Sequence, residues 1–219
     1  MHLSGASNYF YIIVEALRGT YFAGGVVMLP ILVTGVIGFF FLYSSWWRIG
    51  RDFLRNNNTK IVDKLRYSLK KGELEKSKKV LKDRAYRSIV CRELSLALKQ
   101  AEENPSGFQD YMQVRLLKTK RYMEKGNQIV AVMTAAAPLL GLLGTVTGMV
   151  STFEVITLYG NQNPVLMADG ISEALISTQS GLLVAFPLTL LKQRLDERIN
   201  LILEQMQLGA TVIGNYYGI

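Results

Sequence analysis

The chain has 219 residues, of which 49% are hydrophobic and only 19% charged, and its formal net charge is +8. This composition argues against a water-soluble globular protein, because too few polar side chains are present to cover such a surface. Nucleic-acid binding is also disfavoured, since acidic residues interrupt the basic segment throughout. Cys91 and His2 are the single cysteine and histidine, so we expect neither an intramolecular disulfide nor a bound metal.

Residues 1–25 precede the first long apolar stretch. They contain apolar side chains at approximately helical spacing, as in a helix that lies along the outer face of the membrane that the protein spans. An unstructured segment stays open as the alternative. Glu15 and Arg18 stand where a signal peptide would have a basic cluster, and the apolar run that follows is longer than a signal core. We therefore expect this segment to be retained.

Three stretches are long and apolar enough to cross the roughly 30 Å hydrocarbon core of a bilayer as helices. The predicted spans cover residues 26–47, 129–158 and 166–191. The first ends in Trp46 and Trp47 followed by Arg48, an order of residues typical of the headgroup layer. These features predict an all-α, multi-pass integral membrane protein with three transmembrane helices.

Lysine and arginine residues indicate the orientation, because they are enriched near the cytoplasmic ends of transmembrane helices. They follow the first span, precede the second and follow the third, whereas residues 159–165 contain none. We therefore expect the N-terminus and the 159–165 loop outside the cytoplasm. Residues 48–128 and the C-terminal tail, residues 192–219, are expected inside, where their basic side chains would lie near anionic lipids.

Residues 48–128 are predicted to form a basic helical domain, with long helices that extend into it from the spans. We expect one helix over residues 59–71, ended by Gly72, and a longer one over residues 73–101. The Asn-Pro-Ser-Gly sequence at residues 104–107 predicts a turn.

A further helix is expected to begin at this turn, because Ser106 and Gln109 have the spacing of a capping box. We expect this helix to continue through Lys125 directly into the second span.

The second span carries a narrow face of small side chains at steps of three or four residues: Ala137, Gly141, Gly144, Gly148 and Ser151. Such faces let helix backbones approach closely, so Gly141, Gly144 and Gly148 are predicted packing residues. Thr145 belongs to the same face, where its hydroxyl could meet another helix or line a water path.

The third span combines a similar small face with polar groups. Gly181 and Ala185 follow Ser177 at steps of four and are predicted packing positions. Residues 177–180, Ser-Thr-Gln-Ser, place polar groups at membrane depth, where they need hydrogen-bond partners. Two interpretations stay open: these groups bond across packed helices or to their own carbonyls, or they serve an ion path.

Pro138 and Pro187 each remove one helical hydrogen bond within these spans. We expect them to produce structural kinks in the second and third spans, with a foothold for water as the alternative.

Acidic residues near the membrane are candidate functional groups, because a carboxylate in hydrocarbon needs water or a partner. They are Glu154, Asp169 and Glu173. Asp169 is explained by the preference of helix starts for acids. For Glu173, which lies deeper, an ion-passage or intersubunit role and a simple interfacial position both stay open.

The middle of the spans contains no Asp, Lys or His that could relay a proton, so another chain would have to supply the carrier. Residues 141–145, Gly-Leu-Leu-Gly-Thr, lack the ending of a phosphate-binding loop. We therefore expect no nucleotide or other cofactor and no enzymatic activity.

The spans resemble those of the MotA/TolQ/ExbB proton-channel family. Residues 137–149, Ala-Pro-Leu-Leu-Gly-Leu-Leu-Gly-Thr-Val-Thr-Gly-Met, are similar to its second-span signature. Residues 170–175, Gly-Ile-Ser-Glu-Ala-Leu, together with Thr178, Gly181, Ala185 and Pro187, are similar to its third span. The resemblance covers the C-terminal two-fifths of the chain closely.

The resemblance implies a homopentameric ring in the bacterial inner membrane, around two copies of an ExbD/TolR-like single-span protein whose membrane aspartate carries protons. Thr145 and Thr178 would match the polar ring of the central pore, and Glu173 the family's acidic residue in the third span. Proton-motive force would then energise a TonB-like protein that spans the periplasm, for outer-membrane transport.

The chain departs from the family pattern at Thr147, a site often aromatic in ExbB and TolQ, and in its more polar residues 177–180. The choice between an ExbB-like and a TolQ-like subfamily, the latter working with a TolA-like protein in envelope maintenance, therefore stays open. A MotA-like stator and a non-conducting membrane scaffold are further alternatives. The receptor served and the choice between proton and sodium are likewise open.

Overall fold

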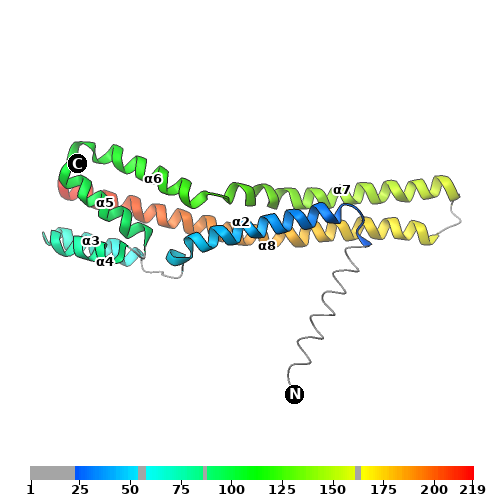
Figure 1. Ribbon diagram of the computed structural model, residues 1–219, viewed down its shortest axis with the longest axis horizontal. Coiled ribbons are helices and arrows are strands. Elements are labelled where there is room, and N and C mark those ends of the chain that lie inside the picture. Colours follow the sequence, from blue (N-terminus) through cyan, green and yellow to red (C-terminus); the bar gives the residue numbers. More distant parts are fainter. Residues whose placement is uncertain (1–22, 54–57, 86–87, 161–163) are drawn as a thin grey trace, which may run out of the picture. The chain divides into compact units, whose positions relative to one another are not determined.

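The computed structural model describes residues 23–53, 58–85, 88–160 and 164–219, and every regular element in these ranges is a helix (Figure 1). The chain divides into two compact units. The apolar unit comprises Met1–Phe41 and Ile129–Leu191, and the charged unit comprises Leu42–Gln128 and Lys192–Ile219. The predicted interfacial helix falls on residues 1–22, which lie outside the described ranges.

Three helices contain stretches long and apolar enough to cross a membrane: α2 (Met28–Phe53), α7 (Asn127–Tyr159) and α8 (Pro164–Tyr217). The described residues are therefore all helical, and the chain is a multi-pass membrane protein. All three helices extend beyond their apolar stretches, and α8 includes most of the predicted C-terminal tail. Charged residues end a hydrophobic run but are good helix formers, so hydropathy does not mark where these helices stop.

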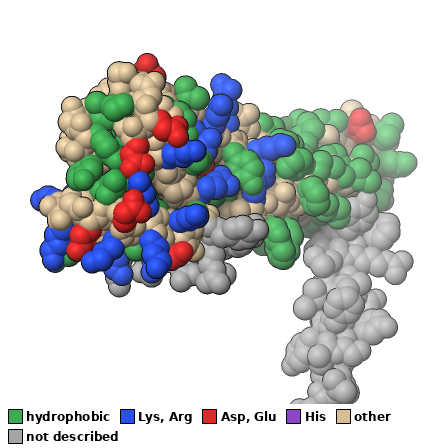
Figure 2. All heavy atoms as spheres, turned by 60° about the vertical axis from the view of Figure 1, so that its left-hand side comes forward, with side chains coloured by type: hydrophobic (Ala, Val, Ile, Leu, Met, Phe, Trp, Pro, Cys, Tyr) green, Lys and Arg blue, Asp and Glu red, His purple; other side chains and the backbone are tan. Residues whose placement is uncertain are grey.

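In the apolar unit, α2, α7 and α8 lie side by side (Figure 1). Val27, Met28 and Ile31 of α2 form a small buried cluster, against which Leu140 of α7 and Val184 of α8 pack. Large apolar side chains cover much of the outer surface of this unit (Figure 2). Such a surface is compatible with lipid rather than with water.

The charged unit is built from the ends of α2 and α8 and from shorter helices between α2 and α7. These are α3 (Asn58–Lys70), α4 (Leu74–Ala85), α5 (Ile89–Glu103), the 3-10 turn η1 (Pro105–Gly107) and α6 (Phe108–Glu124). Lys, Arg, Asp and Glu side chains are interspersed over its surface (Figure 2). Between α4 and α5, Lys78 pairs with Glu102, and this hydrogen bond raises the pKa of Lys78 above its ordinary value.

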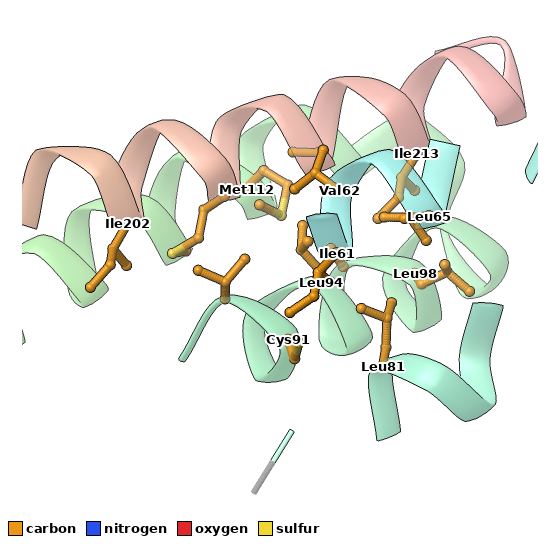
Figure 3. Packing of buried hydrophobic residues seen from close by; sticks show 14 of the residues in the cluster. Ile61, Val62, Leu65, Leu81, Cys91, Leu94, Leu98, Met112, Ile202 and Ile213 are labelled. Carbon is orange, nitrogen blue, oxygen red and sulfur yellow. The ribbon is translucent and has the colours of Figure 1, made fainter. Parts of the chain in front are cut away.

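A hydrophobic core joins α3, α4, α5, α6 and α8 in the charged unit (Figure 3). Leu94 and Leu98 of α5 are buried in the same cluster as Leu65 of α3 and Ile213 of α8. This core gives the charged unit the means to hold its helices in a defined arrangement without the bilayer.

The predicted single helix over residues 73–101 is wrong, because α4 ends at Ala85 and α5 begins at Ile89. Ser88 caps α5 by accepting a hydrogen bond from the backbone N–H of Cys91 at 3.5 Å. An N-cap serine stabilises a helix start, so this local signal competes with the continuous helical pattern.

The predicted capping box is also wrong. The residue before α6 is Gly107, which makes no side-chain capping bond. Instead, Asn104 Oδ1 accepts bonds from the Ser106 hydroxyl (2.9 Å) and the Gly107 N–H (3.3 Å). The short amide side chain therefore stabilises the turn, and the serine belongs to it.

The helix expected to pass unbroken through Lys125 is interrupted, since α6 ends at Glu124 and α7 begins at Asn127. Gly126 adopts a φ of 87°, a left-handed conformation that ends helices. The freed Lys125 carbonyl accepts bonds from the Arg48 guanidinium (2.8 Å) and the Ser45 hydroxyl (3.3 Å) of α2. The break is thus compensated by a neighbouring helix.

Candidate functional site

Helices α7 and α8 approach each other closely at two of the glycines named above. A β-carbon added at Gly141 would lie 3.1 Å from both the Ser177 carbonyl oxygen and Thr178 Cα. One added at Gly181 would lie 2.6 Å from the Ala137 carbonyl oxygen. Only a residue without a side chain permits this backbone contact, which brings α8 residues 177–181 against α7.

The close contact continues along both helices. A β-carbon at Gly148 would lie 2.8 Å from the Gly170 carbonyl oxygen and 2.9 Å from the backbone nitrogen of Ala174. At Gly144 it would overlap the side chain of Ser177, which is fully buried there. The small residues of the two spans therefore face each other within one chain. We call this contact, made at Gly141, Gly144, Gly148 and Gly181, the α7–α8 seam.

Two threonine hydroxyls lie along this seam. The Thr178 hydroxyl donates to the Gly141 carbonyl oxygen across the helix pair at 3.0 Å. The Thr145 hydroxyl, one turn further along α7, donates to the Leu142 carbonyl oxygen of its own helix at 2.6 Å. Both side chains are half-buried, so each has a satisfied donor and retains an accessible surface.

Glu173 lies on a different side of α8. Its carboxylate occupies the space beside Gly25, where any added β-carbon would overlap it. Gly25 precedes α2 and has a φ of 69°, a conformation that favours glycine. A helix N-terminus carries a partial positive charge, so this position suits a carboxylate. The structure thus places Glu173 toward the start of α2 and Thr178 toward α7.

Gln179 lies within the polar residues 177–180 of α8. Its side chain is exposed, on a face of α8 that also exposes Leu175, Leu183 and Phe186. By contrast, Ser177 is buried and bonded to the Ala174 carbonyl oxygen at 2.9 Å. The four adjacent polar side chains therefore lie in different environments, from buried to exposed, and the residue types alone do not predict which environment each one has.

The remaining predicted packing and kink residues are on these same helices. Ala185 is buried in the apolar unit. Pro138 and Pro187 both lie inside continuous helices, α7 and α8, and are half-buried. Within the residues that the structure describes, no cluster of His, Cys, Asp and Glu could hold a metal ion.

The part of the chain that contains α7 and the facing part of α8 matches a known protein family. Residues 77–208 match the MotA/TolQ/ExbB proton channel family, a region that contains α5, α6, α7 and both sides of the α7–α8 seam. The match therefore reaches well beyond the membrane spans, into the charged unit.

Individual relatives resemble the chain over about half to nearly all of its length. A putative biopolymer transport protein, ExbB-like 1, of Synechocystis is 30% identical over 77% of this chain and 66% of that protein. An ExbB homolog of Methanothermobacter thermautotrophicus is 30% identical over 95% of this chain and 71% of its own length. The Tol-Pal system protein TolQ of Pseudomonas aeruginosa is 28% identical over 48% of this chain and 42% of its own. The seam of small residues thus lies in a chain that belongs to the MotA/TolQ/ExbB proton channel family, close to ExbB and TolQ.

Proposed function

We propose that this protein is the channel subunit of an inner-membrane complex that uses the proton-motive force to energise a TonB-like protein for outer-membrane transport. Five copies would form a ring around an ExbD/TolR-like single-span partner, with the N-terminus outside and the C-terminus in the cytoplasm. The proposal is supported by the family membership and by the several relatives named as biopolymer transport proteins.

The observation that carries the proposal is the polar seam between α7 and α8. Gly141 allows the close approach, Thr178 spans it with a hydrogen bond, and Thr145 lies one turn away with a half-buried side chain. Hydroxyl groups can hold water in an otherwise apolar surface but do not release protons near neutral pH. We assign Thr145 and Thr178 to the wall of the proton path and leave proton carriage to the partner.

Glu173 would act at the outer end of this path. Its carboxylate lies beside the turn before α2, which links the first and third spans of one subunit. We propose that it attracts cations to the path and orders the outer ends of these helices. Each proton moving down a potential of 100 mV would supply about 2.3 kcal/mol.

The test is proton flux in liposomes that contain this chain co-purified with its single-span partner. Thr145→Val and Thr178→Val keep side-chain shape and remove the hydroxyl. We expect each to lower the initial flux about tenfold, because water in the path loses a hydrogen-bond partner. Assembly should be unchanged on size-exclusion chromatography.

Two threonines of the same helices provide matched controls. Thr134 and Thr189 donate to carbonyl oxygens of their own helices, each at 2.8 Å, and lie away from the Gly141 contact. Valine at either should leave flux within about twofold of the unaltered complex. If all four variants show the same flux as the unaltered complex, the seam serves only helix packing, and a non-conducting scaffold is favoured.

The biological role is tested separately by deletion. Loss of energised uptake across the outer membrane is expected for a TonB-linked channel. Envelope leakage without an uptake defect would instead indicate a TolQ-like role, and loss of motility would indicate a stator.

A further inference from the structure

Two exposed helix faces of the charged unit have complementary chemistry. The exposed face of α6, with the residue that ends it, is apolar and basic, and its members are Val114, Leu117, Lys118, Arg121 and Lys125. The exposed face of α8 is apolar and acidic, and its members are Glu197, Leu201, Glu204 and Leu208. We name these the basic face and the acidic face.

Each face forms a continuous stripe. On α8 the four residues recur at steps of four, three and four, which keeps them on one side of a helix. Leu117 is 61% exposed and Leu201 is 48% exposed, although both helices also contribute buried residues to the core. Each helix thus has one face packed within its own chain and another that its own chain leaves open.

The charges on these faces are available to a partner. Lys118 and Glu204 form no ion pair with any residue in the described part of the chain. By contrast, Lys120, on a neighbouring side of α6, approaches Glu124 at 3.9 Å. The basic and acidic faces therefore present charged side chains that are unpaired among the described residues, whereas the neighbouring side of α6 holds an ion pair within the helix.

Two contacts define the register of residues 108–127, which comprise α6 and the first residue of α7, against α8, which runs antiparallel to them. At one end, the Asn127 amide donates to the Asp196 carboxylate. At the other, a β-carbon on Gly214 would lie 3.7 Å from the Phe108 ring. Both contacts give the same register to within one residue.

Counting inward from these contacts brings opposite chemistry to the same level. Lys118 is level with Glu204, and Val114 is level with Leu208. Near the Asn127 contact, Lys125 comes level with Glu197. Because these side chains are exposed, they do not cover each other within one chain.

We propose that the basic face of one copy packs against the acidic face of the next copy around the ring. Rotation about a ring axis that runs along the helices leaves every residue at its own level, so Lys118 of one copy meets Glu204 of the next. Val114 and Leu208 pack beside that pair. This contact is heterologous, so repeated copies form a ring when the rotation between them closes, as the proposed ring requires. The inference rests on the proposed ring and specifies which surfaces form it.

Cysteine cross-linking of the full chain, expressed with its single-span partner in membranes, tests the pairing. Val114→Cys with Leu208→Cys should give a ladder of cross-linked subunits on a non-reducing gel after mild oxidation. The native Cys91 is fully buried and needs no replacement. Lys120→Cys with Gln207→Cys is the matched control, because both are exposed on neighbouring sides of the same helices. It should give no ladder.

Charge exchange tests the electrostatic part. In the Val114→Cys, Leu208→Cys background, Lys118→Glu places two carboxylates opposite each other and should lower the cross-linked fraction about threefold, an effect typical of one exposed ion pair. Adding Glu204→Lys should restore it. Lys120→Glu, which changes the net charge equally, should leave the ladder unchanged.

Native mass measurement of the same complexes separates the two hypotheses. A ring-sized complex that cross-links through the control pair, or only within one chain, would overturn the proposed contact and leave the ring intact. A single copy of this chain bound to its partner would instead overturn the ring itself. A ring-sized complex with the predicted ladder and charge rescue supports both.

Discussion

Gly148 shows how little space separates α7 and α8 at the level of single residues. Its missing side chain faces backbone atoms of α8, the Gly170 carbonyl oxygen and the Ala174 nitrogen, rather than flexible side chains. Backbone atoms cannot move aside without shifting the whole helix. A single methyl group at this position therefore tests the integrity of the seam.

We predict that Gly148→Ala destabilises the protein by roughly 1–3 kcal/mol, the range typical of overpacking. Thermal unfolding in detergent, followed by far-ultraviolet circular dichroism, would measure the change. Gly35→Ala is the control, since its β-carbon would meet only the side chain of Val184, at 3.1 Å, which can yield. Alanine is also the better helix former, so Gly35→Ala should be neutral or stabilising.

At the scale of elements, a buried carboxylate joins α5 to α6. Glu93 is 1% exposed, and one of its oxygens accepts a hydrogen bond from Arg115 Nε of α6 at 2.7 Å. Its other oxygen accepts from the Arg92 guanidinium at 3.1 Å. A buried charge with two cationic partners holds two helices in one arrangement, and its removal leaves Arg115, which is partly buried, without its partner.

We predict that Glu93→Ala destabilises the charged unit by about 3–5 kcal/mol, because one partner of a buried ion pair is removed. Differential scanning calorimetry of the purified complex should show the loss. Glu103→Ala removes an exposed carboxylate, 3.6 Å from Lys99 on the same helix, and should change stability by at most about 1 kcal/mol. Similar effects of both substitutions would contradict the structural role given to Glu93.

At the scale of the whole molecule, the middle of the spans contains polar side chains but no Asp, Lys or His that could carry a proton. The apolar parts of α7 and α8 contain hydroxyl and amide groups, and their carboxylates, Glu154, Asp169 and Glu173, lie toward the helix ends. Under the proposed function, we therefore expect an ionisable group from another chain to carry the proton across the middle.

We predict that liposomes containing this chain alone show proton leakage no greater than empty liposomes. Flux should appear only when the single-span partner is incorporated, and should disappear when its membrane aspartate is replaced by asparagine. A pH-sensitive dye inside the liposomes would report both. Conduction by this chain alone would show that its own hydroxyl groups and bound water suffice.

The amino-acid sequence by itself determined the membrane class, the three apolar helices and the family. These follow from the number and order of side chains: apolar runs of bilayer length, glycines at steps of three or four, and a long motif around residues 137–149. Such signals are local, so they survive without knowledge of the fold.

Only the tertiary structure decided which polar groups share an environment. It separated buried Ser177 from exposed Gln179, and it placed Glu173 beside Gly25, far away in the sequence. It also showed the helix break at Gly126, where Arg48 and Ser45 of α2 bond the freed Lys125 carbonyl. In each case the deciding interaction joins residues distant in the chain, because the orientation of a side chain around a helix gains meaning only from the helix packed against it.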